Sequence, residues 1–321
     1  HEQTGVHRSS GRIFKLTYSS AKTPPNPLED AETRLDPVAL AELQLSGSTW
    51  VARRARELLT ELHLSGANLS AAVDIVNERL ASPNHDVTIR LRALWSLVCA
   101  DAVDQTLLES LLKSDEPRLR GWGVRLLVDD WRLDTAFGNR PLDQGRGVEA
   151  DDVRLLVELA ERETAASVRL DLISALQRLP LQHRLELAKP LVATAADAED
   201  HNLPLMAWYG LSPLGEDHLD QLVEALQACA WPTTRRLIAR RIADGSRREP
   251  QPFHDMFSAS LTKDLDFQSD VIAGTAEALA GWRKAEPPDA WDQLVAELES
   301  TQDETLNSAV QNLQVLFGDG R

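Results

Sequence analysis

The segment of this chain with the densest set of chemically reactive side chains is 197–214, which reads DAEDHNLPLMAWYGLSPL. Asp197, Glu199, Asp200 and His201 offer three carboxylates and an imidazole within five residues. Such a group could hold a divalent metal ion or position a proton. The tentative binding residues of this segment are Asp200, His201, Asn202, Trp208 and Tyr209.

A structural role explains the same residues, and we prefer it. Asp200 and Asn202 are residue types that accept hydrogen bonds from the first backbone N–H groups of a helix, and they precede a helical pattern that starts near Leu203. Trp208 and Tyr209 would then fill the core between neighbouring repeats. In this interpretation the segment holds neither a metal nor a catalytic group.

A second candidate site is an arginine-rich stretch between positions 235 and 248. On a helix, residues 236, 240 and 247 fall near one side, so a strip that binds phosphate is conceivable. Helical-repeat DNA glycosylases use surfaces of this general kind. Against this, repeat arginines commonly pair with carboxylates of the next repeat. The arginines concerned are Arg235, Arg236, Arg240, Arg241, Arg247 and Arg248.

The remaining sequence offers no motif for catalysis or for a cofactor. There is no CxxC or CxxCH pattern around Cys99 and Cys229, no HExxH, and no glycine-rich phosphate loop. Trp50, Trp95 and Trp122 lie in or beside helical patterns, and we expect them to belong to the core. An enzyme is therefore not supported by the residues present, and we expect no cofactor and no metal.

Charge and composition narrow the range of partners. The 321 residues include 50 acidic and 34 basic side chains, which gives a formal net charge of −16. This balance disfavours non-specific binding to nucleic acid or to an anionic membrane, because the long-range field repels phosphate. No run of 18 apolar residues occurs, so we expect no membrane span. A protein partner, or flanking domains of the same polypeptide, fits best.

The helices that we expect to position these residues share a sequence pattern that recurs along the chain. In 83–97 (PNHDVTIRLRALWSL) and 114–127 (SDEPRLRGWGVRLL), a short turn precedes an arginine, a small residue lies three positions later, and a leucine lies seven positions later. These offsets place the three positions on one side of a helix. The pattern recurs eight times at an average spacing of about 36 residues. The eight aligned anchor positions are Ala52, Arg90, Arg120, Arg169, Pro204, Arg235, Ile272 and Leu306.

A period of this length with two helices per unit predicts an all-α solenoid of about eight HEAT-like repeats over residues 37–321. Residues 131–150 contain three glycines and a proline, which predicts an insertion loop. At the other end, residues 12–18 alternate apolar and polar side chains like a β-strand, and the proline-rich stretch 19–36 reads as a linker. The chain starts at a histidine without an apolar signal region, so we expect a processed protein or an excised fragment.

Several of these stretches resemble one known family. Residues 7–18 (HRSSGRIFKLTY) look like the closing strand of the propeller in large secreted proteins of planctomycetes, which are usually labelled membrane-bound dehydrogenases or haem-binding proteins. The middle region of those proteins is similar to 50–59 (WVARRARELL), 115–127 (DEPRLRGWGVRLL), and 167–180 with 200–214 (SVRLDLISALQRLP, DHNLPLMAWYGLSPL). In the family, a sugar-dehydrogenase-like β-propeller precedes a HEAT-like region and a c-type cytochrome module.

The resemblance implies that this chain is the central scaffold between a propeller, of which 1–36 would hold the last strand, and a cytochrome. It implies a non-catalytic role, a location outside the cytoplasm, and a protein surface that fixes the spacing of the flanking domains or binds a partner. The parent protein would be the dehydrogenase.

Overall fold

The structure is a computed structural model that describes residues 26–134, 148–298, 301 and 303–318. The described residues form 17 α-helices with short 3-10 turns between some of them, and they contain no strand. None of the described helices is long and apolar enough to cross a membrane. The predicted strand at 12–18 lies outside the described residues.

The chain divides into two compact units, His1–Val103 and Asp104–Arg321, which we describe separately. In the first unit, α2 packs on α3 and α4, and α5 packs on α3 and α4. Its helices are α1 (Ala31–Leu35), α2 (Pro37–Glu42), α3 (Thr49–Leu64), α4 (Ser70–Ala81) and α5 (Val87–Cys99).

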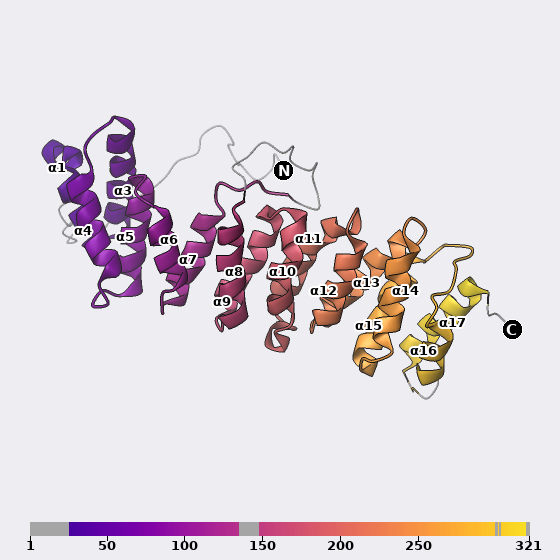
Figure 1. Ribbon diagram of the computed structural model, residues 1–321. Helices are drawn as coiled ribbons and strands as arrows, with labels where there is room; N and C mark the ends of the chain where they lie inside the picture. Colours follow the sequence, from indigo (N-terminus) through magenta and orange to yellow (C-terminus); the bar gives the residue numbers. More distant parts are fainter. Residues whose placement is uncertain (1–25, 135–147, 299–300, 302, 319–321) are drawn as a thin grey trace, which may run out of the picture. The chain divides into compact units, whose positions relative to one another are not determined.

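The second unit consists of helix pairs that follow one another in chain order (Figure 1). The first helices of the pairs are α6 (Gln105–Leu112), α8 (Ala150–Arg162), α10 (Leu181–Val192), α12 (Leu219–Ala228), α14 (Pro250–Ser260) and α16 (Trp291–Leu298). The second helices are α7 (Pro117–Leu127), α9 (Ala166–Ala175), α11 (Leu203–Leu211), α13 (Pro232–Gly245), α15 (Leu265–Ala278) and α17 (Glu304–Phe317).

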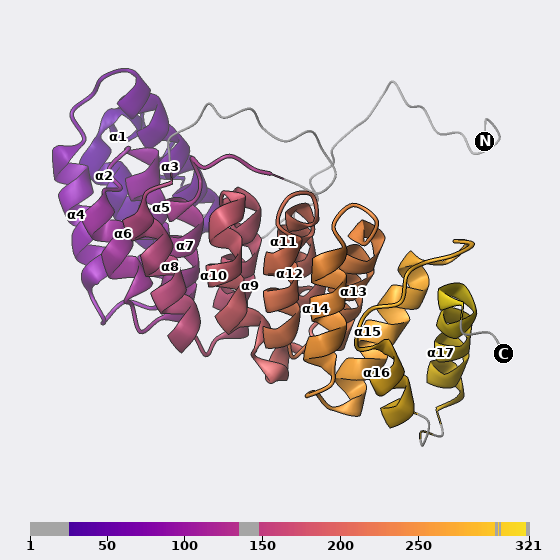
Figure 2. The ribbon, with the colours of Figure 1, turned by 45° about the vertical axis from the view of Figure 1, so that its right-hand side comes forward.

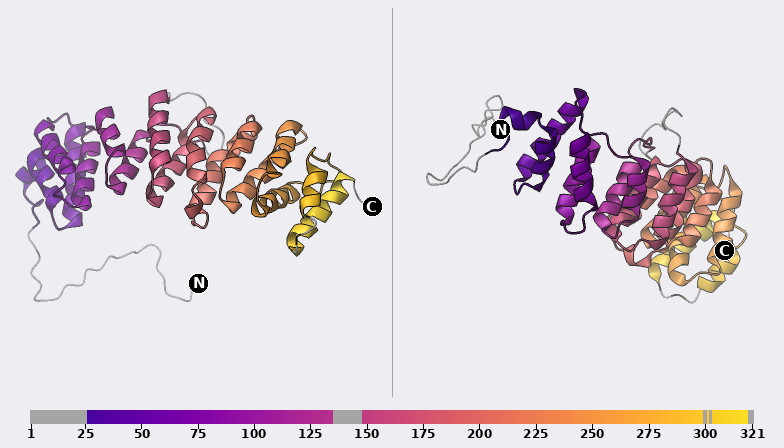
Figure 3. Two further views of the ribbon diagram at one scale, coloured as in Figure 1. Left: turned by 60° about the horizontal axis from the view of Figure 1, so that its bottom comes forward. Right: turned by 60° about the vertical axis from the view of Figure 1, so that its left-hand side comes forward.

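These helices form two layers. Each first helix packs on the first helix of the next pair, and each second helix packs on the next second helix (Figure 2). The succession of pairs is also visible from the two directions of Figure 3. The hydrophobic core of the unit runs between the layers, so each repeat buries its apolar side chains against its neighbours.

The apolar positions that follow from the repeat pattern are confirmed. The eight anchor positions lie on α3 and α5 of the first unit and on the six second helices of the second unit. Every side chain seven residues after an anchor is at most 5% exposed. These side chains are Leu59, Leu97, Leu127, Leu176, Leu211, Ile242, Leu279 and Leu313. The fold class is therefore the predicted all-α helical-repeat solenoid.

The alignment is shifted at three anchors. Pro204 and Leu306 are the second and third residues of their helices, and the largest shift concerns Ile272. The arginines Arg90, Arg120, Arg169 and Arg235 are each the fourth residue of their helix, and the fourth residue of α15 is Gln268. The Gln268 side chain makes the kind of hydrogen bond that the arginines make in the other repeats. Its Nε2 donates to the carbonyl oxygens of Ser260 and Lys263, which precede the helix. The alignment placed the anchor one turn late because a shift of four residues keeps the same helix face inward. Equivalent bonds to the preceding segment join Arg90 to Leu80, Arg120 to Ser114, Arg169 to Glu163 and Asn307 to Thr301.

Three of the anchor arginines also pair with a carboxylate of the next repeat, as the arginine pattern predicted. Arg120 forms a two-pronged ion pair with Glu163, in which both N–O distances are 2.7 Å. The same arrangement joins Arg169 to Asp197 at 2.5 and 2.6 Å. Arg235 instead directs Nε and Nη2 to one oxygen, Oδ2 of Asp270, at 2.7 and 2.6 Å. All three guanidinium groups are largely buried, so the pairs are internal links between repeats. We call them the inter-repeat ion pairs.

One predicted segment boundary is corrected as well. The linker prediction for 19–36 is wrong at its end, because helix α1 occupies Ala31–Leu35 and the Asp30 side chain caps it by accepting from the Thr33 N–H at 2.7 Å. The predicted insertion loop at 131–150 falls between α7 and α8, and the side chain of its first residue, Trp131, is buried in the core. Most of that loop lies outside the described residues.

Candidate functional site

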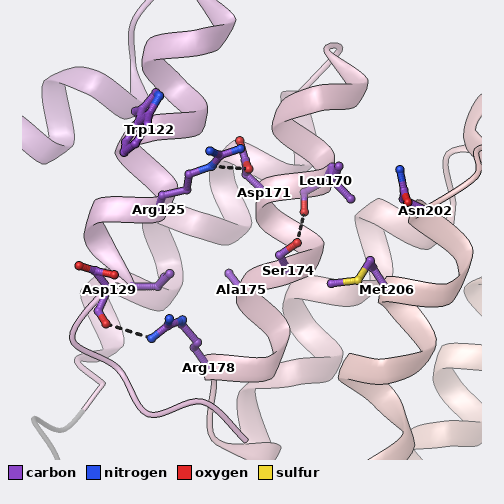
Figure 4. A pocket seen from close by; sticks show the side chains of 11 residues that line it. Trp122, Arg125, Asp129, Leu170, Asp171, Ser174, Ala175, Arg178, Asn202 and Met206 are labelled. Carbon is purple, nitrogen blue, oxygen red and sulfur yellow. Dashed lines mark hydrogen bonds and ion pairs between the residues drawn. The ribbon is translucent and has the colours of Figure 1, made fainter. Parts of the chain in front are cut away.

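The described part of the second unit contains a groove on the exposed side of the second-helix layer. Its volume is about 630 Å³, and helices α7, α9 and α11 form its walls (Figure 4). Side chains that line it include Trp122, Arg125, Asp171, Ser174, Arg178 and Met206. We call this the α7–α11 groove.

The repeat geometry explains why these side chains point into the groove. Trp122 and Arg125 follow the buried anchor Arg120 by two and five residues. Asp171 and Ser174 likewise follow the anchor Arg169 by two and five residues. Because the anchor faces inward, residues two and five positions later lie on the outer side of the helix. Successive second helices therefore present equivalent positions to one shared surface.

An ion pair ties two walls of the groove together. Arg125 on α7 donates from Nε to Oδ1 of Asp171 on α9 at 2.8 Å, and the Arg125 guanidinium carbon lies 5.4 Å from the centre of the Trp122 ring. The Asp171 carboxylate fits against Gly121, where an added Cβ would lie only 2.3 Å from Oδ2. Burial raises the pKa of Asp171, although the Arg125 charge opposes this shift. The position is tightly built, because only glycine at 121 leaves room for the carboxylate.

The opposite end of the groove is held by Arg178, which extends from the end of α9. Its Nη1 donates to the carbonyl oxygens of Asp129 at 2.9 Å and Trp131 at 2.7 Å, both beyond the end of α7. Ser174 donates to the Leu170 carbonyl within the same helix at 2.7 Å. Figure 4 shows the bonds from Arg178 to Asp129 and from Ser174 to Leu170. The groove is therefore a fixed surface with hydrogen-bonding groups at both ends.

The chemistry of the groove is that of recognition. Trp122, Leu170 and Met206 provide apolar surface, while Arg125 and Asp171 retain hydrogen-bonding capacity beside it. Two arginines and two aspartates line the groove, so its formal charge is balanced. No group of three His, Cys, Asp or Glu side chains suited to a metal ion occurs among the described residues.

The tentative site in 197–214 is dispersed in the structure. Asp197 is buried and pairs with Arg169, whereas Asp200 lies on the surface. Oδ1 of Asp200 accepts from the N–H groups of Asn202 at 2.8 Å and of Leu203, the first residue of α11, at 2.9 Å. The two bonds confirm the predicted capping role for Asp200, and they lower its pKa.

The other tentative residues point in different directions. Asn202 accepts no capping bond through its side chain and instead lines the α7–α11 groove. His201 is exposed, and Trp208 packs against the hydrophobic core, as the packing interpretation predicted. Tyr209 is half-buried on the same helix. The five residues therefore do not converge on one pocket, and only Asn202 contributes to the groove.

The arginines of α13 are engaged within the protein. Arg235 is buried in its ion pair with Asp270 and lies 5.4 Å from the Phe267 ring. Arg236 and Arg240 both pair with Glu277 of α15, the latter at 3.9 Å. A phosphate strip on this helix would have to compete with these pairs. The three arginines that complete the set are engaged as well. Arg241 pairs with Asp244, Arg247 stacks on Trp282, and Arg248 donates to the Gly215 carbonyl oxygen at 2.7 Å.

Two of the tryptophans expected in the core are not there. Trp50 is 59% exposed, and Trp122 lines the groove. Trp95 is half-buried beneath the guanidinium of Arg56. Sequence reasoning missed Trp122, Arg125 and Asp171 as site residues. The sequence feature that could have identified them is their position two or five residues after an anchor arginine, which places them on the outer side of the helix.

No protein-family model matches this chain, and no curated protein matches it.

Proposed function

We propose that this chain is a non-catalytic helical-repeat scaffold that binds an extended polypeptide segment in the α7–α11 groove. The observation that supports the proposal is the groove itself, which three successive repeats build from apolar surface and fixed hydrogen-bonding groups. Its outer positions recur from helix to helix, so the groove crosses the helices and suits a ligand that also repeats along its length.

The size of the groove suggests the length of the bound segment. Neighbouring packed helices lie about 8–10 Å apart, so three second helices span about 20 Å. An extended chain advances about 3.3 Å per residue, which corresponds to about six residues across the groove. An aromatic or aliphatic side chain of the ligand would lie on Trp122 and Met206, and polar groups would meet Arg125 and Asn202.

In the wider form of the proposal, the chain is the central module of a larger extracytoplasmic redox protein that links a dehydrogenase-like propeller to a cytochrome. The resemblance of 7–18 and 200–214 to that family supports this context. Cell fractionation with an antibody against the module tests it. We expect a larger haem-staining polypeptide outside the cytoplasm, and a haem-free cytoplasmic polypeptide would contradict it.

The binding proposal is tested by selecting random peptides, about twice the length that fills the groove, on the purified protein. The Kd of the selected peptides is then measured by fluorescence anisotropy for the wild type and for Trp122→Ala. Buried aromatic residues at interfaces contribute about 2 kcal/mol or more, so we expect at least about a thirty-fold loss of affinity.

The matched control is Trp50→Ala, which removes the same side chain from an exposed position in the first unit. Circular dichroism establishes that both variants remain folded. The proposal requires Trp50→Ala to bind like the wild type. If the selected peptides bind Trp122→Ala as tightly as the control, the groove is not the binding site.

A further inference from the structure

The first unit carries, on helices α3 and α5, three arginines that form no ion pair with a carboxylate among the described residues. Arg53 and Arg56 lie one turn apart on α3, and Arg92 lies on the adjacent helix α5. Arg53 is exposed, while the other two are half-buried. This differs from the anchor arginines of α7, α9 and α13, each of which faces a carboxylate. We call the three residues the arginine trio.

A buried glutamine holds two members of the trio in place. Gln44 is fully buried, and its Nε2 donates to the carbonyl oxygens of Leu40 and Ala52. Its Oε1 is thereby turned toward Arg56, which donates to it from Nη1 at 2.8 Å. Arg92 donates from Nη1 to the backbone oxygen of the same glutamine at 3.1 Å and to that of Ser46 at 2.8 Å. Both guanidinium groups are therefore anchored on one residue.

These contacts use only part of each guanidinium. An arginine offers five N–H donors, and for Arg56 and Arg92 only Nη1 is engaged. The Arg56 guanidinium carbon also lies 5.3 Å from the centre of the Trp95 ring, which limits the orientations of its planar group. The remaining donors are pre-oriented, so little conformational entropy is lost when they bind a ligand.

The electrostatics of the trio are unfavourable without a counterion. The acceptors that the structure supplies are neutral oxygens, which leave three positive charges close together. Burial lowers the pKa of Arg56, and the neighbouring charges of Arg92 and Arg53 add to this shift, whereas Cys99 and Glu57 oppose it. Half-buried charges are normally balanced by an opposite charge. A bound anion would remove the repulsion between the arginines.

We propose that Arg53, Arg56 and Arg92 form a binding site for the carboxylates of an acidic segment of a protein partner. The planar fork of a guanidinium group matches a carboxylate with two parallel hydrogen bonds. This site lies in the first unit and is independent of the α7–α11 groove. Its partner chemistry differs too, because the groove is balanced in charge and the trio is purely cationic.

The charge of the whole protein favours a short acidic segment over a long nucleic acid. With a net charge of −16, the chain repels a long polyanion whose charges extend beyond the trio. A short acidic segment needs only a few carboxylates within reach of the three arginines. The site therefore suits a local cluster of Asp or Glu side chains.

The test measures binding of a fluorescent oligoglutamate peptide to the full chain by anisotropy, with an oligoglutamine peptide and a single-stranded oligonucleotide of equal length as competing probes. We expect the glutamate peptide to bind and the glutamine peptide not to bind. Raising the ionic strength from about 0.1 M to about 1 M shortens the Debye length from roughly 10 to roughly 3 Å and should weaken the complex. Tighter binding of the oligonucleotide would overturn the assignment to an acidic protein segment.

Two variants locate the binding. Arg53→Gln should weaken it about three-fold, in the range of an exposed ion pair, while Arg34→Gln removes an equally exposed charge elsewhere in the unit and should have no effect. The double variant with Arg56→Lys and Arg92→Lys keeps both charges but loses the forks, and should weaken binding about ten-fold. Because Arg53 is exposed, its substitution leaves the fold intact even if the lysine variant misfolds. Equal affinities of Arg53→Gln, Arg34→Gln and the wild type would overturn the proposal.

Discussion

Replacing Arg120 by methionine removes the cation from one of the inter-repeat ion pairs and leaves its partner in place. The Glu163 side chain is 0% exposed, and without Arg120 it would keep the hydrogen bond from the Ala165 N–H at 2.8 Å. Breaking a buried pair from one side typically costs about 3–5 kcal/mol, because an uncompensated charge stays in the interior. We expect a loss of stability of this size at neutral pH.

The second substitution Glu163→Gln should restore much of the loss. A glutamine is neutral, has the same shape, and can still accept from Ala165 at the start of α9. We therefore expect the double variant with Arg120→Met and Glu163→Gln to be about 1–2 kcal/mol less stable than the wild type, because a neutral amide is far less costly to bury than a charge. The control is Arg118→Met on the same helix, whose side chain is 65% exposed and which should change little.

The pH dependence separates this explanation from simple loss of packing. In the wild type, burial raises the pKa of Glu163, but the hydrogen bonds from Arg120 and Ala165 outweigh it, so the pKa is lowered. The resulting stability is present above the unfolded pKa of about 4.3 and is lost as the pH falls through the folded value. Without Arg120, burial raises the pKa of Glu163, and protonation then relieves the buried charge.

The assay is urea unfolding followed by far-UV circular dichroism, with the free energy of unfolding determined at several pH values. The difference between the wild type and Arg120→Met should shrink as the pH falls from 7 toward 4. The variant that also carries Glu163→Gln should show no such change. A loss below about 1 kcal/mol at neutral pH, or a loss independent of pH, would refute the reasoning.

Three further predictions concern packing, reactivity and capping. Gly274→Ala places a Cβ 2.3 Å from a backbone oxygen of α13 and should cost about 2–3 kcal/mol in urea unfolding, whereas Gly47→Ala meets nothing within 4 Å and should not destabilise. Burial raises the pKa of Cys229 to about 12, so mass spectrometry after thiol labelling at pH 8 should find Cys99 modified first; faster labelling of Cys229 would contradict its burial. Asp200→Ala should lower the urea midpoint and Asp200→Asn should largely preserve it, and the effect should fade as the pH falls below about 3.9, because the folded pKa is lowered. A midpoint of Asp200→Ala equal to that of the wild type would exclude the cap.

The fold was predictable because its determinants are local. Leu97 and Leu127 lie seven residues after Arg90 and Arg120, and this spacing alone places them on the inner side of a helix. The anchor of α15 was misplaced because Gln268 is a different residue type from arginine, although its amide bonds to the same kind of backbone oxygen. Sequence comparison by residue type cannot detect that equivalence.

The groove was not predicted because it depends on contacts between distant residues. Arg125 and Asp171 are 46 positions apart, and the loop between them obscures their equivalence. Trp122 was assigned to the core because large aromatic residues are usually buried, and a helical pattern does not state which side of a helix faces solvent. The capping role of Asp200 was predictable because it involves only the next three residues.

The inter-repeat ion pairs have a consequence for how the repeats find their neighbours. A leucine or isoleucine follows the anchor by seven residues in every repeat, so two repeats displaced by one helical turn of about 5.4 Å would bury similar apolar surface. The displacement would carry Arg169 away from Asp197 and leave both charges facing hydrocarbon. The inter-repeat ion pairs therefore set the register of the repeats that they join. Apolar packing alone would permit one repeat to slide along its neighbour, and the cost of separating the paired charges opposes this movement.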